Sequence, residues 1–224
     1  MNSDFTTAVM RAVARDNTPN VQRALKEAAT NRVNQIIVDA AKTMKAEFEK
    51  DEVTQEIDGG ITASNSSGTL SGGEGKPYEN LTSFIGFYEG TRPTDEIRKR
   101  LDPTNEDGPR IIKTEKVNNG NVPTYRLTVR AVDIEALHDA TPLPWGEKGG
   151  PSWAEGIEKG IPGFAQFLNK ATSSPKPSHS GGGIQVERTV RNAEYAPPSN
   201  GYLSRIFNNF LKSISAPSYR QRNR

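Results

Sequence analysis

The sequence contains no cysteine in its 224 residues, which excludes disulfides, thiolate metal sites and thiol catalysis together. Hydrophobic residues are also scarce, at 33%, below the usual fraction for a compact globular domain. The 20 glycines and 15 prolines favour loops instead. We therefore expect a modest folded body with long extended segments, part of whose apolar surface is buried only against partner chains.

Long apolar runs are missing as well. No stretch approaches the roughly 18 apolar residues that a membrane-spanning helix requires. The N-terminus, MNSDFTTAVM, contains Asp4 and no apolar core, which argues against a signal peptide. These features predict a soluble protein that is made in the cytoplasm and is not exported by a cleaved signal.

Neither sign of charge dominates, and histidine is rare. The 29 Lys and Arg residues against 27 Asp and Glu residues give a net charge of +2, too balanced for a protein that coats DNA. The two histidines are His138, in a short polar segment, and His179, among Ser, Pro and Gly. Neither an H-E-x-x-H motif nor an EF-hand spacing is present, so a metal site would need carboxylates alone. We predict no metal site and no cofactor.

Sequence patterns for catalysis are incomplete. Ser83 lacks the flanking glycines of a nucleophile elbow, and Lys76 in GTLSGGEGKP is followed by proline where a phosphate-binding loop needs Ser or Thr. Glu155 and Glu158 fall on adjacent helical turns, where an exposed helix face is a simpler interpretation than a hydrolytic carboxylate pair. We predict no catalytic residue, while a triad or carboxylate pair assembled in space stays an open alternative.

The clearest element is a long amphipathic helix from about Asn20 to Glu49, with apolar residues at steps of three and four. Pro19 stands near its first turn, and Thr18 or Asn20 can cap it. At 1.5 Å per residue the helix is roughly 45 Å long, so it must lie across a sheet or another subunit to bury its stripe. The stripe consists of Val21, Leu25, Ala28, Ala29, Val33, Ile36, Ile37, Ala40, Ala41, Met44 and Phe48.

The rest of the chain mixes short strands and short helices. The patterns predict a strand over 53–64, or a hairpin that turns there at Gly59–Gly60, and strands over 81–90 and 184–191. They also predict a hairpin from 110–117 and 124–132. They predict helices over 5–15, 93–101 and 133–140, from Ser152 onward, and over 202–214. The predicted fold is α+β, with the long helix packed on a mainly antiparallel sheet. It comprises a leader (1–18), one domain (19–214) with Gly/Pro-rich arms at 65–80 and 141–183, and a basic tail (215–224).

The order of four sequence blocks carries a resemblance to a known class of proteins. The blocks are NLTSFIGFYEGTRPTDEIRKRL, PLPWGEKGGPSWAEGIEKGIPGFAQFL, SHSGGGIQVE and the closing aromatic helix, within residues 20–214. In this order they resemble tailed-bacteriophage virion proteins of the head–tail junction, of the neck, tail-completion or tail-terminator type. The resemblance implies a long helix packed on an antiparallel sheet, extended arms that reach neighbouring subunits of a ring, and no catalytic residues.

Two sets of residues are candidates for contacts with partners. Large aromatic side chains that would be costly on a monomer's surface are candidate anchors of a subunit interface, although they would equally well fill the chain's own core. These are Trp145, Trp153, Phe164, Phe167, Phe207 and Phe210. Basic residues on one strand face and at the chain's end are candidates for loose contact with DNA in a ring lumen. These are Arg126, Arg130, Arg220, Arg222 and Arg224.

The leading hypothesis is a non-enzymatic virion protein, assembled in the host cytoplasm. It would form a ring of identical subunits, six-fold by expectation, that joins head to tail and lets DNA pass. Its partners would be other copies of itself and neighbouring neck, portal-adaptor or tail-tube proteins. We expect no contact with a membrane. The alternatives are another virion component, such as a capsid decoration or baseplate protein, or a phage hydrolase that depends on carboxylates.

Overall fold

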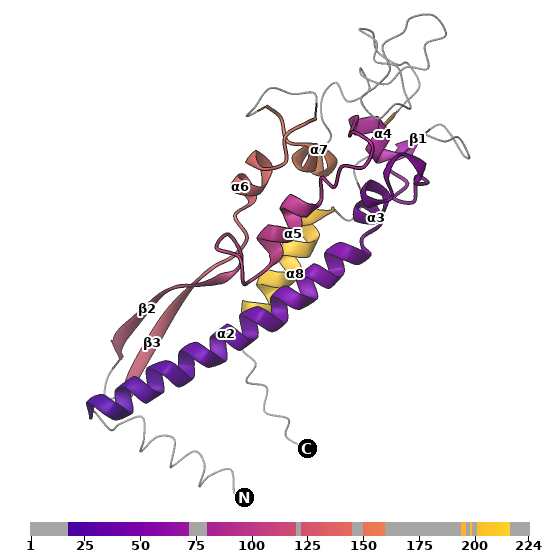
Figure 1. Cartoon of the computed structure of the whole chain (residues 1–224). Helices are drawn as coiled ribbons and strands as arrows, with labels where there is room; N and C mark the ends of the chain where they lie inside the picture. Colours follow the sequence, from indigo (N-terminus) through magenta and orange to yellow (C-terminus); the bar gives the residue numbers. More distant parts are fainter. Residues whose placement is uncertain are drawn as a thin grey trace, which may run out of the picture.

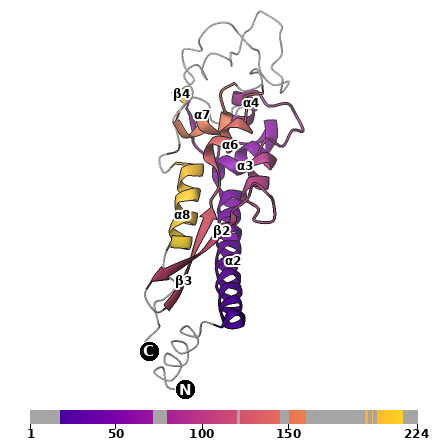
Figure 2. The ribbon, with the colours of Figure 1, turned by 90° about the vertical axis from the view of Figure 1, so that its left-hand side faces the viewer.

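The computed structural model is an elongated molecule built along one long helix (Figure 1). It describes residues 18–71, 80–119, 122–144, 150–159, 194–195, 198 and 201–215. Short helices gather around one end of the long helix, and a two-stranded hairpin runs beside its other end, as the rotated view also shows (Figure 2). The fold is mixed α+β, which confirms the predicted class.

The long helix, α2, spans Pro19–Lys50, as the apolar periodicity predicts. Thr18 occupies the N-cap position with an extended backbone, and Pro19 stands in the first turn, where its fixed φ favours the helix. The buried positions lie only in the second half, at Ile37, Ala40, Ala41, Met44 and Phe48. The first half of the helix therefore extends beyond the core.

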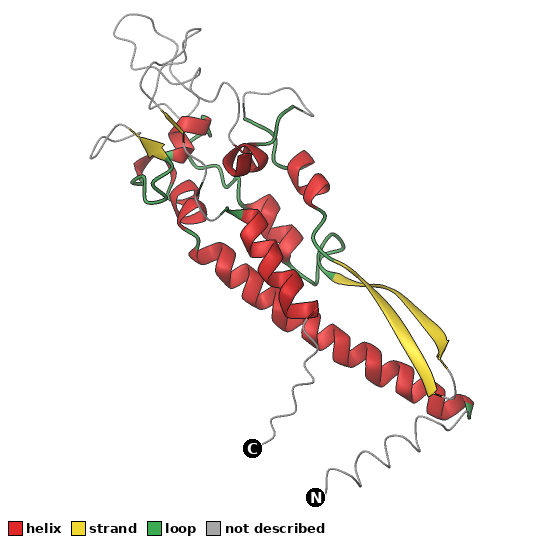
Figure 3. Ribbon diagram, turned by 180° about the vertical axis from the view of Figure 1, so that it is seen from behind, coloured by secondary structure: helices red, strands yellow, loops and turns green. Residues whose placement is uncertain are grey.

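The core is formed by short helices around the second half of α2 (Figure 3). Their bounds are α3 Glu52–Asp58, the 3₁₀ turn η1 Gly60–Thr62, α4 Leu81–Ile85, α5 Asp95–Leu101, α6 Ile134–Asp139, α7 Trp153–Lys159 and α8 Leu203–Ser215. Of these helices, α3, α5 and α8 pack on α2 itself, and the others pack on its neighbours. The helices predicted over 93–101, 133–140, from Ser152 and over 202–214 are thus confirmed. The Ser152 hydroxyl accepts from the backbone N–H of Glu155 at 3.1 Å, which is the predicted cap.

Two predicted strands are helices instead. The segment 53–64 contains α3 and η1, and the segment 81–90 contains α4. Val53 and Ile57 are four residues apart and both buried, which is the spacing of a helical face; the glycines after them end the helix and do not turn a hairpin. In the second segment Leu81, Phe84 and Ile85 have the same helical spacing.

The strands form two small antiparallel pairs. β2 (Arg110–Asn119) and β3 (Val122–Arg130) make the predicted hairpin, with an irregularity in register between Ile111 and Lys113. β1 (Leu70–Ser71) pairs with β4 (Glu194–Tyr195). The predicted strand 184–191 and the predicted helix 5–15 lie outside the described residues.

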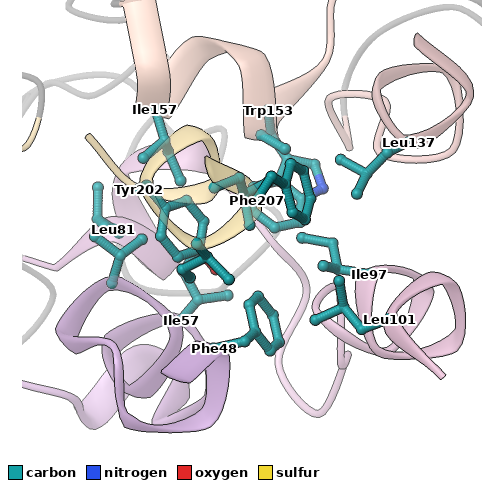
Figure 4. Packing of buried hydrophobic residues seen from close by; sticks show 14 of the residues in the cluster. Phe48, Ile57, Leu81, Ile97, Leu101, Leu137, Trp153, Ile157, Tyr202 and Phe207 are labelled. Atoms are coloured by element: carbon teal, nitrogen blue, oxygen red, sulfur yellow. The ribbon is translucent and has the colours of Figure 1, made fainter. Parts of the chain in front are cut away.

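Aromatic side chains from distant parts of the sequence meet in the core (Figure 4). The rings of Phe48 and Tyr202 stack with their centroids 6.1 Å apart, and the Tyr202 hydroxyl lies 2.7 Å from the Thr54 hydroxyl. Phe87 and Trp153 meet edge to face at 5.5 Å. These pairs join α2, α3, α7 and α8 into one apolar cluster.

Glu56 is a buried carboxylate that holds two loops onto α3. Its Oε1 accepts from the backbone N–H of Leu81 at 2.7 Å. Its Oε2 accepts from the backbone N–H of Ser67 at 3.0 Å and from the Ser67 hydroxyl at 2.6 Å. Burial raises the pKa of Glu56 above its ordinary value, and the hydrogen bonds from Ser67 and Leu81 oppose this rise.

The variant Glu56→Gln tests this site through pH. Because the pKa of Glu56 is raised by folding, the folded chain holds this proton more tightly than the unfolded chain does. The contribution to stability is full below the ordinary value of 4.5 and is lost as pH rises through the raised pKa. We expect the free energy of unfolding of the wild type, relative to Glu56→Gln, to fall as pH rises above 4.5. Urea denaturation measured at several pH values gives this difference, and an increase with pH would contradict the assignment.

Candidate functional site

The half of α2 that extends beyond the core forms a protruding arm with the hairpin. From here on, the arm means residues 19–36 with the hairpin 110–130, and not the Gly/Pro-rich arms predicted at 65–80 and 141–183. The head means the other described residues. The Tyr125 hydroxyl donates to the backbone oxygen of Gln22 at 2.9 Å, with the Gln22 side-chain oxygen at 3.2 Å, which ties β3 to the first turns of α2. The arm is thus built from segments about 100 residues apart in sequence.

The apolar side of the arm is only partly covered. Tyr125, Leu127 and Val129 alternate along β3 and are half-buried, as the predicted two-residue period requires. Along residues 19–36 of α2 no side chain is buried, and Val21 and Leu25 on the predicted stripe are half-exposed. The chain itself therefore leaves apolar surface of the arm in contact with solvent.

The two arginines predicted on the other face of β3 differ in their surroundings. Arg126 is exposed and stands opposite Glu115 in the hairpin. Arg130 is half-buried, stands opposite Arg110, and donates to the backbone oxygen of Glu106. Of this pair, Arg126 is the more accessible to an anionic partner. Arg220, Arg222 and Arg224 lie outside the described residues.

Three of the predicted interface aromatics are core residues. Trp153 is 2% exposed, Phe207 5% and Phe210 3%, and all three belong to the apolar cluster of the head. They are therefore not available as anchors for a second subunit, because the chain's own helices cover them. This corrects the interface prediction in favour of its alternative, that these aromatics fill the core. Trp145, Phe164 and Phe167 lie outside the described residues.

A charged cluster that was not expected from the sequence fastens α5 to α2 and α3. Arg98 donates to both carboxylate oxygens of Glu49 at 2.7 Å, to Asp95 at 3.0 Å and to Asp58. Its guanidinium also lies 5.6 Å from the centroid of the Phe48 ring. The hydrogen bonds to Glu49, followed by those to Asp58 and Asp95, raise the pKa of Arg98 further above its ordinary value. One guanidinium against three carboxylates leaves the cluster with a net charge of −2, but Arg98 is hydrogen-bonded to all three acids, so the cluster serves to join α5 to α2 and α3.

A cleft of about 490 Å³ opens beside the junction of α2 and α3. Glu47, Asp51, Glu52 and Arg205 are among its lining residues. One carboxylate oxygen of Asp51 caps α3 by accepting from the backbone N–H of Val53 at 2.9 Å, and the other pairs with Arg205. Burial raises the pKa of Asp51, and the Val53 N–H and Arg205 oppose the rise. Both oxygens of the most buried acid in the cleft are therefore engaged in structure.

The carboxylates considered for hydrolysis also have structural partners. Oε1 of Glu158 accepts from the backbone N–H groups of Tyr202 and Ser204, at 3.1 and 2.8 Å, and its Oε2 accepts from the Ser204 hydroxyl. Glu158 thus caps the start of α8, while Glu155 pairs with Lys159 at 2.8 Å. Within the described ranges no group of three His, Asp or Glu residues is placed to hold a metal ion.

Comparison with known proteins adds no assignment: no family model, no curated protein and no solved structure matches this chain. Over the part of the chain that the structure describes, no helix has the length and apolar character needed to cross a bilayer.

The core position of the aromatics predicts the effect of a pair of substitutions on α8. Phe207→Ala removes a buried ring and should lower the free energy of unfolding by about 3–5 kcal/mol. Leu211→Ala, at a position 42% exposed on the same helix, should cost less than about 1 kcal/mol. Chemical denaturation of both variants measures the difference. If Phe207→Ala weakened assembly and left stability unchanged, Phe207 would be an interface residue after all.

Proposed function

We propose that this protein is a structural subunit of a tailed-phage particle, which forms a ring at the neck or tail-completion layer that joins head to tail. The observation that carries the proposal is the arm: a long helix and a hairpin that project from a self-sufficient core with their apolar side half-covered. Such a shape suits a subunit that completes its burial against a neighbour.

The energetics of the arm support this proposal. Residues 19–36 extend about 27 Å at 1.5 Å per residue. Most helical stability in proteins comes from the packing of an apolar face, and this segment packs its apolar face only in part. A single two-stranded hairpin is marginal in water. Each supports the other through contacts such as Tyr125 with Gln22, and a neighbouring subunit would supply the burial that both still lack.

The sequence resemblance adds the location within the particle. Blocks of the chain resemble head–tail junction proteins, whose rings surround the DNA path. In such a ring Arg126, exposed on the hairpin, would provide loose electrostatic contact with phosphates and no sequence readout.

Two other functions are kept as alternatives. A capsid decoration or baseplate protein would use the same arm against different neighbours. A carboxylate-dependent hydrolase would need an acid and a base free to act, and the cleft beside Asp51 is the place for a substrate. The engagement of Asp51 and Glu158 in capping favours the structural role.

Native mass spectrometry of the purified full chain tests the proposal. We expect one closed oligomer, six-fold by preference, or assembly on addition of isolated phage heads or tails. Negative-stain images should show a ring with a central opening. A chain that stays monomeric under all these conditions and hydrolyses a cell-wall or polysaccharide substrate would overturn the proposal in favour of the enzyme. Antibody labelling of intact particles separates the junction from the capsid surface and the baseplate.

A further inference from the structure

The near-neutral net charge of the chain conceals two regions of opposite charge. In the arm, eight Lys and Arg residues stand against two acidic residues, Glu27 and Glu115, which gives +6. In the described head, nineteen Asp and Glu residues stand against ten Lys and Arg residues, which gives −9. The arm and the head lie at opposite ends of α2 (Figure 1). Over the described residues, the two ends of α2 are therefore associated with opposite net charges.

The positive end of the molecule is the tip of the arm. Arg23 and Lys26 on α2, and Lys116 and Arg126 on the hairpin, are all exposed. The same turns of α2 carry the half-exposed Val21 of the apolar stripe. Apolar surface surrounded by basic side chains is typical of a protein interface with an acidic partner.

A matching acidic surface lies on the head at α6. Glu135 and Asp139 are exposed four residues apart, and Ile134 beside them is 46% exposed. Asp107, also exposed, lies in the loop before β2, which Arg130 holds against the end of β3 by donating to the adjacent Glu106. We call Asp107, Ile134, Glu135 and Asp139 the α6 patch.

Within one chain the arm tip and the α6 patch cannot neutralise each other. Lys116 stands six residues along β2 from Arg110, where the hairpin meets the head, a distance of about 20 Å at 3.3 Å per residue. The Debye length in physiological salt is about 8 Å, so solvent screens these charges from one another. A protein surface that pairs with either set of charges would therefore have to belong to another molecule.

We propose that the arm tip of one copy docks on the α6 patch of a second copy. The contact is heterologous, so its repetition closes a ring when the rotation between copies allows it. This inference rests on the proposed function and names the two surfaces that would join its subunits.

A second copy fits the arm better than a nucleic acid does. The described head offers acidic side chains with which the basic arm tip can pair. The apolar stripe beside Arg23 and Lys26 gains nothing from a phosphate backbone, whereas a protein surface that includes the exposed Ile134 would bury it.

Complementary charge reversals test the contact in the full chain. The arm-reversed variant carries Arg23→Glu, Lys26→Glu and Lys116→Glu. The patch-reversed variant carries Asp107→Lys, Glu135→Lys and Asp139→Lys. A control variant with the same change of net charge as the first reverses exposed lysines elsewhere on the head: Lys42→Glu, Lys50→Glu and Lys212→Glu. Arg126 and Asp133 are left unchanged, because Arg126 faces Glu115 across the hairpin and Asp133 caps α6.

Sedimentation velocity at about 0.1 M and about 1 M NaCl, where the Debye length falls from about 10 Å to about 3 Å, measures assembly. We expect the wild type and the control to assemble in low salt, with at least a tenfold weaker affinity in high salt. Each reversed variant alone should stay monomeric while circular dichroism shows it folded. An equimolar mixture of the two should assemble again, because each arm tip then meets an α6 patch of opposite charge.

Other results separate this inference from the proposed function. If both reversed variants assemble like the wild type, the ring stands and the arm-to-patch contact is wrong. If the wild type is monomeric in both salts and with isolated heads and tails, the proposed function itself fails. A third result would overturn the inference: the mixture does not assemble, and only the arm-reversed variant loses binding to a duplex DNA oligomer. The arm would then bind nucleic acid and not a second copy.

Discussion

The packing of the second half of α2 against α8 determines the shape of the whole molecule. Phe48 on α2 stacks on Tyr202 at the start of α8, and the Tyr202 hydroxyl bonds to Thr54 on α3. Glu158 on α7 caps α8 at the same place, so four helices meet around one aromatic pair. Because the core buries residues of α2 only from Ile37 onward, the first half of the helix protrudes from it.

The protruding half of α2 is the part of the structure that most needs a functional explanation. A helix of that length needs burial that the head cannot reach, and the hairpin supplies it on one side alone. The charges follow this division, with bases on the arm and acids on the head. We propose that this division of charge and apolar surface is completed by a second copy of the chain.

The sequence predicts those elements whose apolar residues follow one clear period. The 3.6-residue stripe of α2 and the two-residue alternation around Leu127 are both confirmed. The prediction is wrong at α3, although its buried positions have helical spacing, and at α4, where all five residues are buried and the period is hidden. The capping residues offered a signal: the Asp51 and Asn80 side chains cap these helices, and Gly86 ends α4 at φ 86°. The Arg98 cluster and the buried Trp153 depend on tertiary contacts that no local pattern encodes.

The central claim is that a neighbouring copy buries the apolar surface that the arm leaves exposed. Native-state hydrogen exchange of the full chain tests it most directly, through the amides of residues 19–36 of α2 compared between monomeric and assembled protein. The account predicts that these amides exchange readily in the monomer and become at least tenfold more protected on assembly, while those of residues 37–50 in the core change little. Equal protection of residues 19–36 in both states, with new protection elsewhere, would contradict it.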